Sequence, residues 1–74
     1  MTKSQKAVLD TLVEYGPLAD HALVPIMQHE SLARMTSSSI RSRRAELVKV
    51  GKVVPFDEIK MPSGRHATVW MARA

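Results

Sequence analysis

The residues with the clearest chemical potential are the serines and arginines of the run SSSIRSRR at positions 37 to 44. A serine acts as a nucleophile only when a neighbouring base activates it, and the sequence places no histidine or lysine to do so. Hydroxyls at a helix start already have a sufficient role, because they accept hydrogen bonds from free backbone donors. Arginines are permanent cations with several donors and suit phosphates. The run therefore indicates anion binding, and we expect no enzymatic activity.

The histidines do not form a recognisable metal-binding pattern. His21, His29 and His66 lack the i, i+4 spacing that would place two ligands on one helix face. The chain has no cysteine, and its carboxylates are not clustered. We expect neither a metal site nor a cofactor.

Charge is distributed unevenly along the chain. Residues 1 to 33 carry two Lys against four Asp or Glu, a net charge of −2, whereas residues 34 to 74 carry nine Lys or Arg against three acids, a net charge of +6. A cluster of cations attracts polyanions and gains entropy from released counterions. The second half is thus expected to face nucleic acid, with a merely solvated basic surface as the alternative.

The length allows one domain, spanning residues 1–74. Without cysteine, no disulfide can stabilise it. No apolar run approaches the roughly 18 residues of a membrane span, and the opening MTKSQK lacks the apolar stretch of a secretory signal. We expect a soluble, cytoplasmic protein that does not contact a membrane.

Two helices are predicted in the first half. Thr2 and Gln5 have the spacing of a capping box, so a helix should begin near Lys3 and end near Tyr15, before Gly16 and Pro17. Its apolar face should comprise Val8, Leu9, Leu12 and Val13.

Asp20 can cap a second helix beginning at His21, in which Pro25 should cause a kink or a late start. This helix should bury Leu23, Val24 and Met27. The stretch from Gln28 to Met35 could be either more of the second helix or the turn after it.

A third helix is predicted over residues 36 to 50, with Gly51 as its cap. At about 100° per residue, its buried stripe contains Ile40, Leu47, Val48 and Val50. The opposite face, about 100° to 200° from Ile40, is small, polar and cationic and contains Ser38, Arg41, Ser42, Ala45 and Lys49.

A hairpin, or wing, is predicted over residues 52 to 72. Its first strand spans 52 to 56, with Pro55 restricting it to a sheet edge, and its second spans 67 to 71. Residues 57 to 65 are expected to form the loop, with a turn at Pro62-Ser63-Gly64. Three helices followed by a two-stranded hairpin define a mostly helical α+β fold of the winged helix-turn-helix type.

In such a fold the third helix could enter the major groove of double-stranded DNA. Small serines would allow close approach, Arg41 could reach a guanine edge, and Lys49 could meet a phosphate. Arg43 and Arg44 lie nearer the buried stripe and could either hold phosphates or pair with Glu46 or an acid of the first helix. Lys60 and Arg65 flank the hairpin tip and should contact the backbone or minor groove. The predicted DNA-binding residues are Ser37, Ser38, Arg41, Ser42, Arg43, Arg44, Lys49, Lys60 and Arg65.

The stretch SSSIRSRRAELVKVGKVV followed by PSGRHATVW resembles small winged helix-turn-helix DNA-binding proteins of actinobacterial phages and their hosts. The resemblance covers about residues 16 to 73, and its specific part is 36 to 71. It implies a winged helix with a regulatory or excisionase-like architectural role on DNA. The matching positions are Ser38, Ser39, Ile40, Arg41, Ser42, Arg43, Arg44, Glu46, Leu47, Val48, Gly51, Val53, Ser63, Gly64, Arg65, Val69 and Trp70.

Two further alternatives concern partners and Trp70. The basic helix could instead dock on an acidic host protein, making the chain a protein-binding module. A specific DNA binder of this size reads about half a site, so a homodimer is a reasonable expectation, although no heptad is present to mediate it. Trp70 could stack on a base, but burial against the first helix is the favoured interpretation.

Overall fold

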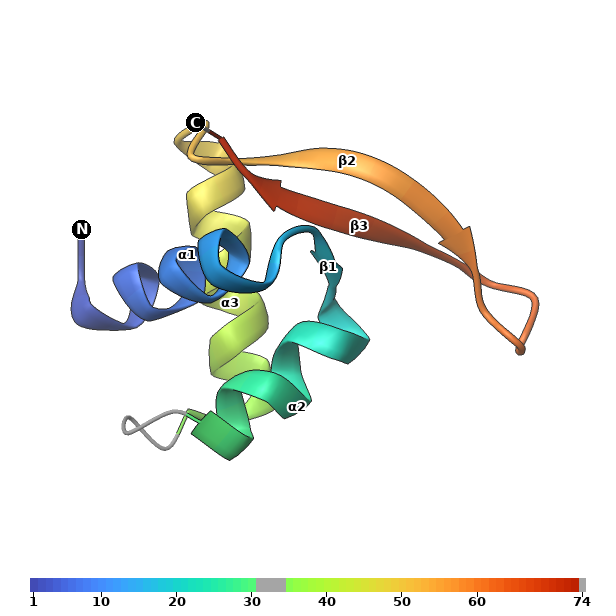
Figure 1. Cartoon of the computed structure of the whole chain (residues 1–74), viewed down its shortest axis with the longest axis horizontal. Coiled ribbons are helices and arrows are strands. Elements are labelled where there is room, and N and C mark those ends of the chain that lie inside the picture. The colour runs from blue at the N-terminus through green and yellow to red at the C-terminus, as the bar shows by residue number, and fades with distance from the viewer. Residues whose placement is uncertain (31–34, 74) are drawn as a thin grey trace.

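The computed structural model describes residues 1–30 and 35–73. Within these ranges the chain forms a small α+β domain with three helices and a three-stranded antiparallel sheet (Figure 1). The elements in chain order are α1 (Lys3–Tyr15), β1 (Leu18–Ala19), α2 (Asp20–Glu30), α3 (Ser37–Lys49), β2 (Val53–Lys60) and β3 (His66–Ala72).

The boundaries of α1 confirm the prediction from its capping residues. The Thr2 hydroxyl accepts a hydrogen bond from the Gln5 backbone N–H at 3.1 Å, and the Gln5 side chain accepts one from the Thr2 N–H at 3.0 Å. This reciprocal pair satisfies two donors that the first helical turn leaves free. The helix ends where Gly16 adopts a φ of 82°, a conformation that a side chain would disfavour.

The second helix begins at Asp20, one residue before the predicted start, and runs through Pro25 to Glu30. The expected late start is therefore wrong, and Pro25, the sixth residue of α2, leaves one backbone hydrogen bond of the second turn unmade. Of the stretch that the sequence left open, Gln28 to Glu30 belong to α2 and Met35 is buried, while residues 31 to 34 lie outside the described part.

The third helix begins after Thr36, whose hydroxyl accepts a hydrogen bond from the Ser39 N–H at 3.1 Å. At its other end Gly51 has a φ of 78°, and two bonds close the helix, from Gly51 N to Val48 O and from Lys52 N to Leu47 O. This is the Schellman arrangement, in which a glycine reverses the chain. The predicted span of 36 to 50 is confirmed within one residue at each end.

The core is formed by one face of each helix and the base of the hairpin. Its most deeply buried large side chains are Val8, Leu12, Leu23, Ile40, Leu47 and Val53. Two predicted core residues are wrong. Val13 is 68% exposed because it lies about 100° around α1 from Leu12, and Val50 is 66% exposed because it follows the last residue of α3.

The sheet has the order β1-β3-β2 and corrects two expectations. First, Asp57 to Lys60, predicted as loop, continue β2 and pair with Val69 to His66, so the loop is only residues 61 to 65. The charged side chains of this segment are typical of a loop, but its backbone forms a strand because it pairs with β3. Second, the hairpin is not two-stranded alone, because β1 pairs with β3 through Leu18 and Trp70. Two residues are too few to show a strand pattern.

The hairpin turn itself is confirmed. Gly64 N donates to Met61 O, which closes a turn with Pro62 at its first central position, and Gly64 has a φ of 88°. β2 lies at an edge of the sheet, as Pro55 predicted, and a bulge between Pro55 and Asp57 leaves Phe56 unpaired.

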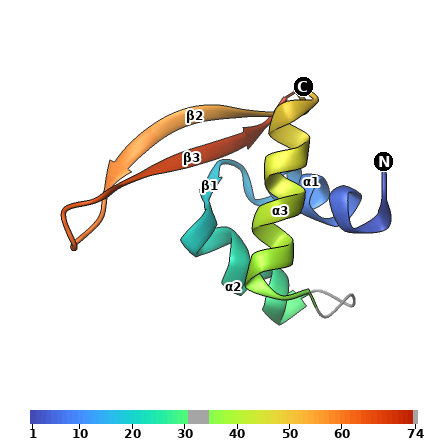
Figure 2. The same cartoon turned by 180° about the vertical axis from the view of Figure 1, so that it is seen from behind.

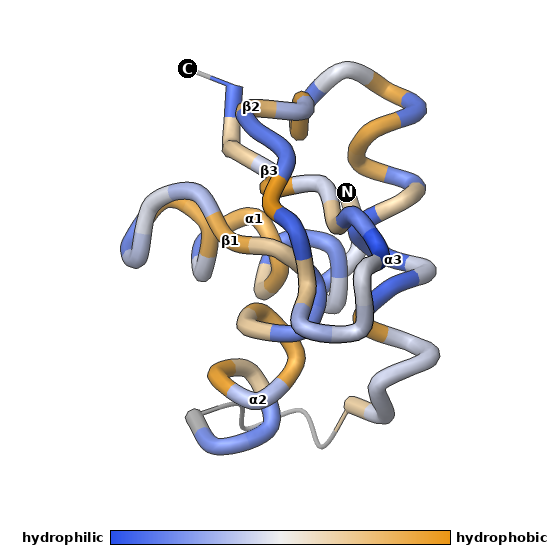
Figure 3. Tube along the Cα trace, turned by 90° about the vertical axis from the view of Figure 1, so that its right-hand side faces the viewer, coloured by the Kyte–Doolittle hydropathy of each residue, from blue (hydrophilic) through white to orange (hydrophobic). Residues whose placement is uncertain are grey.

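The hairpin extends from the end of α3 and projects beyond the helices. Figures 1 and 2 show it arching away from the three helices, with β1 and α2 on the same side of the molecule as its tip. Figure 3 views the molecule from this side and shows hydrophobic and hydrophilic positions alternating along the chain. Among the described helices, none has the length and apolar character that crossing a membrane requires.

Candidate nucleic-acid interface

The face of α3 opposite the core is exposed along its length. Burial of Ile40 and Leu47 turns this face outward, and all of its five predicted residues are exposed, namely Ser38, Arg41, Ser42, Ala45 and Lys49. Ser37, in the first turn, is half-buried. The face therefore combines three small side chains with two long cationic ones.

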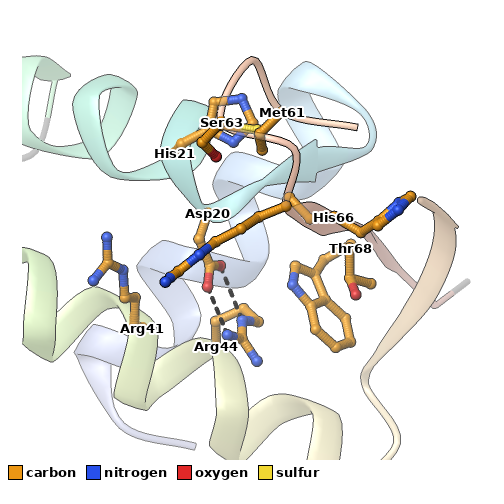
Figure 4. Close-up of a pocket in the computed structure, with 11 residues that line it drawn as sticks. Asp20, His21, Arg41, Arg44, Met61, Ser63, His66 and Thr68 are labelled. Atoms are coloured by element: carbon orange, nitrogen blue, oxygen red, sulfur yellow. Dashed lines mark hydrogen bonds and ion pairs between the residues drawn. The ribbon is translucent and has the colours of Figure 1, made fainter. Parts of the chain in front are cut away.

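An open hollow of about 560 Å³ lies between this helix, the start of α2 and the hairpin. Figure 4 shows Arg41 and Arg44 reaching it from α3, and His66 and Thr68 from β3. Arg65, immediately before β3, also lines it. The hollow thus brings together an arginine of the third helix and an arginine of the hairpin that the sequence could only place separately.

Arg44 is held in place by two other elements. Its Nε and Nη2 donate to the two carboxylate oxygens of Asp20 at 3.0 and 2.6 Å, and its guanidinium lies 4.4 Å from the centre of the Trp70 ring. The side chains of Arg44 and Asp20 are only 17% and 23% exposed. The pair joins α2, α3 and β3 and offsets the charge of Arg44.

This pairing corrects the expected partner of Arg44. The sequence suggested Glu46 or an acid of the first helix, but the partner is Asp20, the first residue of α2, because Arg44 lies on the side of α3 that faces the hairpin. Trp70 is half-buried and packs against the core, to which α1 contributes Val8 and Leu12. The Arg44 guanidinium therefore lies over the face of an indole ring that the core holds in place.

Arg43 lies on the side of α3 that faces α1. Its Nε is 2.9 Å from Glu46 Oε1, which confirms the predicted pairing with Glu46. The Nε atom is buried, and its alignment falls short of hydrogen-bond geometry, so the contact is an ion pair only. Gln5 of α1 donates to the same carboxylate oxygen at 2.8 Å. Arg43 thus belongs to a contact between α1 and α3, and phosphate binding by it stays a prediction.

Four of the predicted DNA-binding cations remain available for a ligand. Arg41, Lys49, Lys60 and Arg65 are exposed, and within residues 1–30 and 35–73 none of them forms an ion pair. The acids of the hairpin are engaged locally, since Glu58 lies 3.0 Å from His66 and Asp57 accepts a bond from the Glu58 N–H. These acids lie midway along the hairpin.

Sequence reasoning missed the contributions of Asp20, His21 and Thr68 to the hollow. No spacing could have revealed them, because they meet α3 only through the packing of α2 and β3.

No protein-family model matches the sequence, and no curated protein or solved structure is significantly similar to it.

Proposed function

We propose that the protein is a winged helix-turn-helix domain that binds double-stranded DNA. In this proposal α2 and α3 form the helix-turn-helix, α3 is the recognition helix, and the β2–β3 hairpin is the wing. The observation that carries it is the convergence of Arg41 from α3 and Arg65 from the hairpin on one open hollow, with neither cation paired among the described residues.

The exposed face of α3 suits the major groove on physical grounds. The groove is about 12 Å wide and is bordered by phosphates, so an entering helix needs small residues that allow close approach and cations long enough to reach base edges or phosphates. Ser38, Ser42 and Ala45 supply the first, and Arg41 and Lys49 the second. Arg41 would donate two hydrogen bonds to a guanine edge, and Lys49 would contact a phosphate.

The hairpin supplies contacts outside the groove. Lys60 ends β2 and Arg65 precedes β3, so both cations flank the turn at the tip. They would bind backbone phosphates beside the recognition helix, which adds affinity without sequence preference. Arg43 and Arg44 would mainly support the helix, because a phosphate would have to compete with Glu46 or Asp20 for them.

The resemblance of residues 36 to 71 to small phage-type winged helices favours a role as a transcriptional regulator or an excisionase-like architectural protein in the bacterial cytoplasm. This role follows from the DNA-binding proposal and depends on it.

A titration of the protein against a labelled random duplex at two salt concentrations tests the proposal. Binding should weaken steeply with salt, because each phosphate contact releases counterions, and should be greatly reduced in an Arg41→Ala/Lys49→Ala variant. A Lys3→Ala/Lys6→Ala variant removes the same charge from α1 and should bind nearly as the unchanged protein does. If low salt gives no binding, or if both variants lose affinity equally, the proposal is wrong. The basic face would then be tested against acidic proteins.

A further inference from the structure

The two faces of the hairpin have opposite characters. Cross-strand partners share a face and successive residues alternate, so the register assigns each residue to one side. On the side of the hollow, the base is apolar and packs on the core through Val53, Trp70 and Ala72. Towards the tip the same side is polar and carries Glu58, Lys60, His66 and Thr68.

The other side, here called the outer face, is mainly apolar. By the register it contains Val54, Ile59, Ala67, Val69 and Met71, with Asp57 as its one acid; Ala67, near the tip, also borders the hollow. None of these apolar residues belongs to the described core or packs against it; Ile59 is 37% exposed, and Val54, Val69 and Met71 are half-buried. A sheet face that meets only water is normally polar, and here the pattern is reversed. The outer face therefore has the composition of a surface that a partner covers.

Pairing through the edge of β2 is a less suitable way to cover it. Pro55 has no N–H to donate along this edge, and the bulge at Phe56 interrupts a regular ladder. Both features protect edge strands from adding a further strand. Packing of one face on another requires no free backbone groups and is compatible with both.

The charged residues around the outer face are arranged so that two copies of the chain could bring opposite charges together. Lys52 and Arg73 extend the hairpin at its base, where Arg73 N donates to Lys52 O, and each lies one position beyond a core-facing residue. Both side chains therefore belong to the outer side. Asp57 lies farther along this face, opposite Val69 and between Val54 and Ile59 on β2. A two-fold, antiparallel contact would bring Asp57 of each copy to the Lys52 and Arg73 end of the other.

We propose that the outer face of the hairpin is a homodimer interface, in which two copies pack face to face around Val54, Val69 and Met71. Such an isologous contact leaves α3 and the hollow of each copy accessible. The face of one hairpin is small, so the dimer is expected to be weak, with a dissociation constant on the order of micromolar or above.

Sedimentation equilibrium without DNA tests this interface independently of DNA binding. With rising concentration, the mass of the unchanged protein should increase from 8.2 kDa towards twice that value. An Asp57→Lys variant and a Lys52→Glu/Arg73→Glu variant should each dimerise about tenfold or more weakly, because like charges then meet across the two-fold axis. An equimolar mixture of the two variants should regain dimerisation, since every contact in the mixed dimer again joins opposite charges.

A Lys6→Glu variant on α1 is the matched control and should dimerise normally. Circular dichroism of each variant verifies that it is folded. The proposal is overturned if the unchanged protein stays monomeric at millimolar concentration, if the control is weakened as much as the outer-face variants, or if the mixture of folded variants fails to associate.

Discussion

Replacement of Asp20 by Asn removes the charge that holds Arg44 and keeps the shape of the side chain. Exposed ion pairs contribute about 0 to 1 kcal/mol, whereas breaking a fully buried pair costs about 3 to 5 kcal/mol. The Asp20–Arg44 pair is 23% and 17% exposed and has two hydrogen bonds, so it lies between these limits. Because hydrogen bonds to charged groups contribute about 1.5 to 3 kcal/mol, we expect a loss of about 2 kcal/mol. For a domain of this size this lowers the Tm by about 8 to 16 °C.

The measurement is urea unfolding followed by circular dichroism, with Asp10→Asn as the control. Asp10 pairs with Lys6 at 2.9 Å, but their side chains are 61% and 69% exposed, so this variant should lose no more than about 0.5 kcal/mol. A double-mutant cycle of Asp20→Asn with Arg44→Met isolates the interaction from other effects. Equal losses for Asp20→Asn and Asp10→Asn, or a coupling energy near zero, would refute the reasoning that partial burial gives the Arg44 pair its strength.

Two further predictions concern α3 and the hairpin tip. Arg41→Ala should cost about 1 to 3 kcal/mol on a preferred DNA site and relax specificity, whereas Arg65→Ala should weaken preferred and random duplexes alike; equal effects of both changes on the two duplexes in a fluorescence titration would remove Arg41 from base recognition. Thr36→Ala should destabilise the fold by about 1 kcal/mol in urea unfolding, because the Ser39 N–H loses its 3.1 Å acceptor, and an unchanged stability would show that this cap contributes nothing.

Local signals predicted the helices well because each helix end is made by neighbouring residues. The Thr2–Gln5 capping box, the Thr36 cap and the positive φ of Gly51 act over three or four positions, so the sequence contains them in full. The errors concerned burial and occurred at residues that the helical periodicity assigns to the buried face only approximately. Val13 and Val50 are apolar, but one lies off the buried face and the other follows the last helical residue.

The hairpin was harder to predict because a partner strand, not its own pattern, extends it. Residues 57 to 60 contain three charged side chains and resemble a loop, yet their backbone pairs with residues 66 to 69. The bulge at Phe56 further disturbs the alternation that a sequence pattern would use.

The sequence by itself determined the three helices, the hairpin turn and the exposed face of α3 with its small and cationic residues. All of these depend on residues close together in the chain. Only the tertiary structure decided which cations are free. Arg41 and Arg44 belong to the same run, but Asp20 and Trp70 pack on Arg44 from α2 and β3, while Arg41 stays exposed. The electrostatic role of each arginine thus depends on contacts between residues that are distant in sequence, which spacing alone does not encode.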